Sequence, residues 1–200
     1  MSEEALKVIC VIGSLHRNSV VRGVIQLAAD RLRSETCQVD VVNFESEPLA
    51  LFNPETSHQS PHLAELRHRV NKADVILLGT PDYHGSMSGA LKNFLDHFWH
   101  EFAGKLFVTV VASHEKGLTV SDQLRTVARQ CYAWALPYGV SFAEGQDFKD
   151  GEFLTDQFKS RFEMMLRDLH VYGHLLARQR RLDLAGHDPG FMARHRKKSV

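Results

Sequence analysis

The sequence has few cysteines, no long apolar run and no excess of charge of either sign. Its three cysteines are far apart and form no C-x-x-C pair. We therefore expect neither a zinc site nor a disulfide framework. We expect the protein to be located in the reducing cytoplasm. No apolar run approaches the roughly 18 residues that suggest a membrane span. The 24 basic residues equal the 24 acidic ones in number, and a nucleic-acid partner is not expected.

Several well-known functional motifs are also missing. The absence of G-x-x-x-x-G-K-[ST] argues against a P-loop NTPase, and the absence of G-x-G-x-x-G after the first apolar run argues against a tightly held dinucleotide. The 12 histidines include no H-E-x-x-H pair. His97 and His100 are three residues apart, but no third ligand is evident, so no metal site is predicted.

Short apolar runs alternate with segments of helical spacing along most of the chain. Such β-α alternation predicts one doubly wound parallel sheet with helices on both faces. The expected order of its five strands is 2-1-3-4-5. The predicted strands cover residues 7–12, 38–42, 75–78, 105–112 and 140–142.

The charge is uneven although it sums to zero. Residues 178–200 carry seven arginines and lysines against two aspartates. We therefore predict one domain over residues 1–177 and a basic C-terminal tail over 178–200. Such a tail is most simply a solvated, partly disordered end, and contact with an anionic partner or a neighbouring subunit is the alternative.

Polar loops follow three of the predicted strands, at residues 13–19, 80–89 and 112–119. In a sheet of this order, the first two of these loops flank the point where the strand order reverses, which is where ligands bind. The loop at 13–19 places Ser14, Arg17 and Ser19 at the start of a helix, a favourable position for an anion. A helix start capped by Ser19, with a solvated Arg17, is the simpler interpretation of the same residues.

The loop at 80–89 offers backbone N–H groups, hydroxyls and the flat ring of Tyr83. It contains no nucleophile with an adjacent base and no acid–base pair. That set of groups suits holding a planar cofactor better than attacking a bond, and we assign no catalytic side chain.

Two motifs together resemble those of the NAD(P)H-dependent FMN reductase family of flavodoxin-like flavoproteins. The family pattern G-S-x-R-x-x-S corresponds here to G-S-L-H-R-N-S at 13–19, and T-P-E-Y-N-G-S-x-P-G-x-L-K-N-x-x-D corresponds to residues 80–96. The resemblance runs from about residue 7 to residue 142. It implies a flavodoxin-like domain with FMN as cofactor, NAD(P)H as co-substrate and a homodimeric or homotetrameric assembly.

The resemblance also implies a set of cofactor-binding residues. The phosphate would be held by Ser14 and Ser19, with either His16 or Arg17 in reach of it. The flavin ring would be bordered by Pro81, Asp82, Tyr83, His84 and Gly85, and closed on its other side by Ser113 and Gly117. The chain departs from the family pattern at four of the motif positions, namely His16, Asp82, His84 and Ser88.

The implied activity is transfer of a hydride from a reduced nicotinamide to flavin N5, followed by delivery of the electrons to a small acceptor. A flavin, a quinone, an azo or nitro compound and a metal oxyanion all remain open as acceptors. Two alternatives remain as well. One is a flavodoxin-like electron carrier, and the other is a non-catalytic flavin-binding protein.

Overall fold

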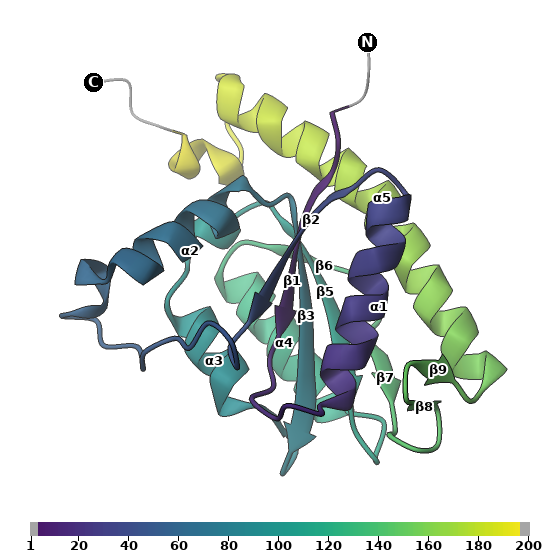
Figure 1. Ribbon diagram of the computed structural model, residues 1–200. Coiled ribbons are helices and arrows are strands. Elements are labelled where there is room, and N and C mark those ends of the chain that lie inside the picture. Colours follow the sequence, from purple (N-terminus) through teal and green to yellow (C-terminus); the bar gives the residue numbers. More distant parts are fainter. Residues whose placement is uncertain (1–3, 197–200) are drawn as a thin grey trace.

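The computed structural model describes residues 4–196 and contains a central, mostly parallel sheet (Figure 1). Its strands follow the order β2-β1-β3-β5-β6, with β7 also paired to β5 and the short β4 paired to β3. The strands are β1 (Lys7–Ile12), β2 (Gln38–Asn43), β3 (Val75–Tyr83), β4 (Ser86–Met87), β5 (Leu106–Ala112), β6 (Trp134–Ala135) and β7 (Val140–Phe142). The predicted order is confirmed, although β6 and β7 share the place of the single fifth strand.

Helices cover both faces of the sheet. One face packs against α1 and α5, and the other against α2, α3 and α4, so that the core divides into two apolar clusters (Figure 1). The α-helices are α1 (Val20–Ser34), α2 (Pro61–Lys72), α3 (Gly89–Asp96), α4 (Leu118–Gln130) and α5 (Asp156–Ala185). Short 3-10 helices are η1 (Ser57–Gln59), η2 (His100–Phe102) and η3 (Phe191–His195).

The apolar spacing of the sequence accounts for this layering. The β1 run is buried from Val8 to Ile12 because each face of the strand meets a different helix layer. In α1 the apolar side chains recur at helical spacing and are fully buried, while the intervening polar ones are not. The apolar run of β1 and the helical spacing of α1 could both be predicted from the sequence because each extends over several residues.

Two antiparallel hairpins are present that the sequence analysis did not predict. The strand β3 continues to Tyr83 and turns back into β4, and β8 (Phe148–Lys149) pairs with β9 (Glu152–Phe153). Each turn has two central residues with positive φ, His84–Gly85 and Asp150–Gly151, as two-residue hairpins require. Strands of two residues are too short to show a hydrophobic period, so only the turn residues could have indicated them.

The basic C-terminal segment begins inside a helix. The predicted boundary at residue 177 falls within α5, which continues to Ala185. Beyond it, Met192 of η3 is only 1% exposed, and Arg180 Nε donates a hydrogen bond to the Ala103 carbonyl at 2.9 Å. Much of this segment therefore packs against the domain. Lys197 and Lys198, which belong to the predicted tail, lie outside the described residues.

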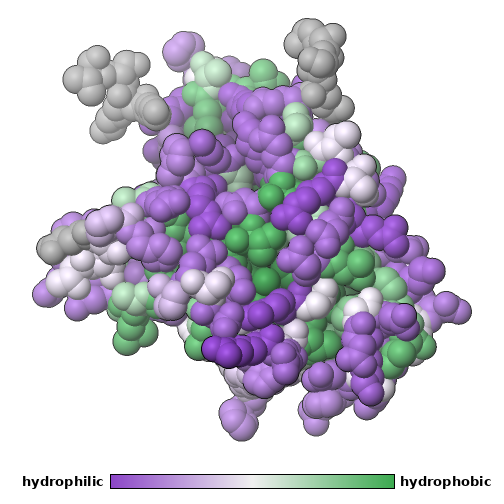
Figure 2. All heavy atoms as spheres, viewed as in Figure 1, coloured by the Kyte–Doolittle hydropathy of each residue, from purple (hydrophilic) through white to green (hydrophobic). Residues whose placement is uncertain are grey.

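The surface is mostly hydrophilic on the side drawn in Figure 2, with hydrophobic atoms in view between α1 and α2. Within residues 4–196, no helix is long and apolar enough to span a membrane. The same residues contain no cluster of three or more histidine, cysteine, aspartate or glutamate side chains able to hold a metal ion. All three cysteines are free and buried, and burial raises the pKa of Cys10 to about 12.

One cation is completely buried. The ammonium group of Lys105 donates hydrogen bonds to the Val70 and Asn71 carbonyls at the end of α2, the second at 2.9 Å. Burial, reinforced by the neighbouring Arg180, lowers the pKa of Lys105 to about 7. The side chain thus binds two carbonyls at the end of α2, one of which, that of Val70, also accepts from the Ala73 N–H, at the cost of desolvating a charge.

This burial predicts a pH dependence of stability. The unfolded chain protonates Lys105 up to its ordinary pKa of 10.5, whereas the folded chain loses that proton near pH 7. Between these values the unfolded state binds more protons, so the free energy of unfolding should rise with pH. Urea unfolding at about pH 7 and about pH 8, below the ordinary cysteine pKa of 9.0, measures the change.

The matched comparison is between two lysine variants. Lys105→Met should remove most of the rise, and the exposed Lys72→Met should keep it. An equal pH dependence in the wild-type protein and Lys105→Met would contradict this account of Lys105.

Candidate functional site

The carboxyl ends of β1 and β3 approach each other at backbone distance. The N–H of Gly13 donates to the Gly79 carbonyl at 2.8 Å. A Cβ added to Gly13 would lie 2.5 Å from that carbonyl oxygen, and one added to Gly79 would lie 2.5 Å from Ile25 Cγ1. Gly13 therefore lets the two strand ends approach each other, and Gly79 lets α1 pack closely on the end of β3.

Ser88 ties the two loops together. Its hydroxyl donates to the Gly13 carbonyl and accepts from the Leu91 N–H at 3.1 Å, so it also caps α3. Its own N–H donates to Thr80 Oγ1 at 3.0 Å. Ser88 is one of the four departures from the family pattern, and its hydroxyl provides a link between the loops that a proline lacks.

The β3–β4 hairpin is held on two sides. Asp82 Oδ1 accepts from the Gly85 N–H at 2.8 Å, and Oδ2 accepts from the Ser113 hydroxyl, also at 2.8 Å. The side-chain amide of Gln123 in α4 accepts from the Ser86 hydroxyl at 3.0 Å and donates to the Gly85 carbonyl at 3.2 Å. The loops after β3 and β5 are thereby locked in one relative position.

A cavity of about 260 Å³ lies where these loops meet. It is bordered by the loop after β1, the end of β3 and the loop after β5, at the carboxyl edge of the sheet (Figure 1). Of the predicted site residues, it is lined by Ser14, His16, Ser19, Pro81, Asp82, Tyr83 and Ser113. A site at this edge is the arrangement expected for a sheet of this order.

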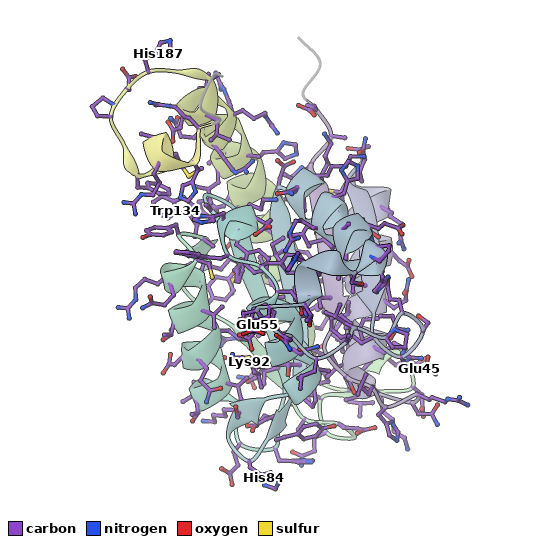
Figure 3. The ribbon with its side chains drawn as sticks, turned by 90° about the vertical axis from the view of Figure 1, so that its left-hand side faces the viewer. Glu45, Glu55, His84, Lys92, Trp134 and His187 are labelled. Atoms are coloured by element: carbon purple, nitrogen blue, oxygen red, sulfur yellow. The ribbon has the colours of Figure 1, made fainter. Side chains whose placement is uncertain are left out.

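The other four predicted residues do not line this cavity. Arg17 is 87% exposed at its side chain, and its Nε donates to Glu45 Oε1 at 3.1 Å. His84 is at the tip of the β3–β4 hairpin, pointing away from the body of the molecule (Figure 3). Gly85 shapes the same turn, and Gly117, with a positive φ of 58°, precedes α4.

The cavity contains polar groups suited to an anion. Ser14 is only 2% exposed, and its Oγ accepts from the His16 N–H at 3.3 Å. Ser19 stands at the N-cap position of α1, yet its hydroxyl accepts no bond from the helix. The first N–H groups of α1, the Ser19 hydroxyl and the Ser14 hydroxyl proton are thus available to a ligand.

The lining also includes residues that the sequence analysis did not assign to the site. These are Asn18, Val20, Val21, Ala112, His114 and Glu144. Asn18 and His114 lie in the loops at 13–19 and 112–119, which were predicted to border the site, so their position in the sequence was a reason to include them. Nothing in the sequence indicated Glu144, which lines the cavity, or Gln123, which binds the β3–β4 hairpin, because both are distant in sequence from the loops they contact.

A larger cavity, of about 460 Å³, lies at the β2 edge of the sheet. Its walls include Lys7, Gln38 and Arg69. Arg69 is engaged by the carboxylates of Asp40 and Glu47, at 2.7 and 2.6 Å. This cavity is remote from the loops that follow β1, β3 and β5, so we assign the functional site to the smaller one.

Solved structures share this fold. An NADH:FMN oxidoreductase in its apo form aligns with a TM-score of 0.67 at 19% identity, covering 86% of this chain and 89% of that one. A flavoenzyme NAD(P)H:(acceptor) oxidoreductase from Paracoccus denitrificans gives 0.69 at 13% identity, covering 88% and 98%. A flavodoxin from the Archaea gives 0.57 at 13% identity, covering 84% and 99%. The fold is flavodoxin-like, as predicted.

The chain belongs to the NADPH-dependent FMN reductase family, whose model matches residues 6–147. An FMN-dependent NADPH-azoreductase of Staphylococcus aureus (strain USA300) is 26% identical over an alignment of 165 residues that covers 74% of this chain and 87% of the relative. Membership confirms the predicted family, the class of NAD(P)H-dependent oxidoreductase, and FMN and NAD(P)H as cofactor and co-substrate.

The close packing of α1 on the end of β3 can be tested on stability. Gly79→Ala should lower the free energy of unfolding by about 1–3 kcal/mol, because the added methyl group overlaps Ile25 and Val21. Gly89→Ala is the matched control, since no atom lies within 4 Å of its added Cβ. It should change stability by less than about 0.5 kcal/mol. Equal effects of the two substitutions in denaturant unfolding would contradict the described packing.

Proposed function

We propose that the protein is an FMN-dependent oxidoreductase that takes a hydride from NADPH or NADH and reduces a small acceptor. The observation that carries the proposal is the cavity that joins Ser14 and Ser19 to Pro81, Tyr83 and Ser113. One end of the cavity offers hydroxyls and helix N–H groups, and the other end is bordered by the rings of Pro81 and Tyr83 and by the Ser113 hydroxyl. This arrangement fits a planar molecule that carries a phosphate.

The phosphate end would be held by Ser14, Ser19 and the first N–H groups of α1. Hydroxyl and amide donors at a helix N-terminus stabilise a dianion without a nearby cation. His16 lines the same end. Arg17, held by Glu45, would act at most from a distance.

The ring end would be bordered by Pro81, Asp82, Tyr83 and Ser113. Each oxygen of Asp82 accepts a hydrogen bond, one from the Gly85 N–H and one from the Ser113 hydroxyl, so we assign Asp82 to positioning the two loops. Tyr83 is 53% exposed, which leaves its ring free to stack on a ligand or on a second molecule above it.

FMN, when bound, would supply the redox chemistry by accepting a hydride and passing two electrons onward. The protein's contribution is then to hold two planar molecules in register and to aim N–H donors at the ring edge. Such a transfer needs no side-chain nucleophile, and we assign the Ser113–Asp82 hydrogen bond in the cavity to joining the two loops. The azoreductase relative makes an azo compound one reasonable acceptor; a flavin, a quinone, a nitro compound and a metal oxyanion are the others.

We further propose a homodimer or homotetramer in the cytoplasm. Three exposed aromatic side chains favour an assembly: Trp99, Trp134 and Phe191, of which the last two lie 5.9 Å apart between ring centroids. Large exposed aromatics are typical of subunit contacts. The free cysteines favour a reducing compartment. Sedimentation equilibrium tests the assembly.

The proposed activity is tested by adding FMN to the purified protein and following NADPH and NADH oxidation with a flavin, a quinone and an azo dye. We expect saturable FMN binding and turnover with at least one acceptor. FMN binding without turnover, together with electron exchange with a separate reductase, would identify an electron carrier instead. Failure to bind FMN at saturating concentration would overturn the proposal.

A substitution of Ser19 distinguishes a role in binding the phosphate from a role in capping α1. Its hydroxyl makes no capping bond, whereas Thr155 accepts from the Phe158 N–H at 3.3 Å at the start of α5. Ser19→Ala should leave the stability of the FMN-free protein within about 0.5 kcal/mol and weaken FMN binding roughly tenfold, the equivalent of 1.4 kcal/mol. Thr155→Ala should cost about 1 kcal/mol of stability and leave FMN affinity unchanged.

Denaturant unfolding and FMN fluorescence titration measure both quantities. If Ser19→Ala destabilised the protein as Thr155→Ala does and left FMN affinity intact, Ser19 would be a helix cap and not a phosphate ligand.

A further inference from the structure

A second cavity adjoins the candidate cofactor site. It has a volume of about 550 Å³ and shares Ser113 and His114 with the smaller cavity. One wall is formed by the loop after β5 and by α4, and the other by the end of β7 and the first turns of α5. A molecule lying over the ring end of the cofactor site can therefore extend past His114 into this groove.

Two cations in the groove have no partner. Lys116 lies in the loop after β5 and Arg161 lies on α5, so they come from opposite walls. Both are exposed, and within residues 4–196 neither makes an ion pair or a side-chain hydrogen bond. In contrast, Arg125 is held by Asp122 at 3.4 Å and by the Pro137 carbonyl at 2.7 Å.

The acidic groups of the groove are already engaged. Asp147 accepts from the Ala143 N–H at 2.9 Å and from the Thr155 hydroxyl at 3.0 Å. Asp122 faces Arg125. The groove is lined by the three cations Lys116, Arg125 and Arg161 and by the two carboxylates Asp122 and Asp147, so its lining carries a net positive charge that favours anionic ligands.

The remaining lining is suited to a large polar ligand with flat parts. Gln146, Gln157 and Ser141 offer amide and hydroxyl groups, and Leu118 and Phe158 offer apolar surface. Lys116 has a positive φ of 66°, a conformation that glycine or asparagine adopts more readily than lysine. A lysine held there against its backbone preference is more typical of a functional position than of a neutral one.

We propose that this groove binds the phosphate groups of NADPH, with Lys116 and Arg161 as the contacts that favour NADPH over NADH. The inference rests on the proposed function, because it takes the nicotinamide to lie over the ring end of the cofactor site. NADPH carries a diphosphate and a separate 2′-phosphate, and the groove presents cations on two separate walls. Arg161 offers a planar fork for a phosphate, and Lys116 a mobile point charge.

The test uses Lys116→Gln, Arg161→Gln and the double variant of the FMN-loaded protein. Each single substitution should raise KM for NADPH about five- to tenfold, the effect of losing one charge-assisted hydrogen bond to a phosphate. KM for NADH should rise less, kcat should stay within about twofold, and the FMN dissociation constant should not change. The KM for NADPH should also become less sensitive to salt.

Lys159→Gln is the matched control. Lys159 is an exposed cation on the same helix, two residues before Arg161, and it lies outside the groove. It removes the same charge, so an equal rise in KM for NADPH in this variant would show a general charge effect and overturn the proposal. An unchanged KM for NADPH in both groove variants would overturn it as well.

Direct titration with NADP⁺ by calorimetry separates this inference from the proposed function. If the wild-type protein turned over NADPH and bound NADP⁺, but the groove variants bound it equally well, only the groove would be misassigned. If no turnover occurred, weaker NADP⁺ binding in the groove variants than in Lys159→Gln would still support the inference, and no NADP⁺ binding by the wild-type protein would overturn it. A rise in KM confined to a sulfonated azo acceptor would assign the groove to the acceptor and contradict our assignment.

Discussion

The approach of β1 and β3 at Gly13 and Gly79 is the constraint on which the candidate site depends. The two strand ends are joined by a direct backbone hydrogen bond, a Cβ on Gly13 would collide with the Gly79 carbonyl oxygen, and a Cβ on Gly79 would collide with α1. The loops that follow are then linked through Ser88, and the second of them is linked to the loop after β5 through Asp82 and Ser113. Three loops far apart in the sequence thereby border one small cavity, which a side chain at either glycine would distort.

The site separates groups that build it from groups that remain available. The Asp82 carboxylate and the Ser88 hydroxyl have their hydrogen-bonding capacity used within the protein, so they define geometry. The Ser19 hydroxyl, the first N–H groups of α1 and the cations Lys116 and Arg161 are not used in this way. Hydroxyl and N–H donors in the cavity, together with cations in the adjoining groove, are suited to holding anionic, planar molecules.

The sequence was informative wherever a pattern was long or a residue type was demanded by geometry. Continuous apolar runs predicted the buried strands, their order followed from the β-α alternation, and the motif at 80–96 indicated the cofactor class. The sequence was uninformative about contacts between distant segments. Nothing near Arg17 showed that Glu45 would hold it outside the cavity, and nothing near Gln123 showed that it would clamp the β3–β4 turn. The sequence also did not show that residues 178–196 would pack against the domain, because this packing depends on the burial of Met192.

The central claim is that the loops after β1, β3 and β5 together bind one FMN molecule. Amide NMR spectra recorded during an FMN titration test it most directly, because every non-proline residue in these loops reports on its own surroundings. The account predicts that the largest shifts occur together in residues 14–20, 82–83 and 113–114, with one common dissociation constant. Shifts confined to one of these loops, or centred on the β2-edge cavity around Lys7 and Gln38, would contradict it.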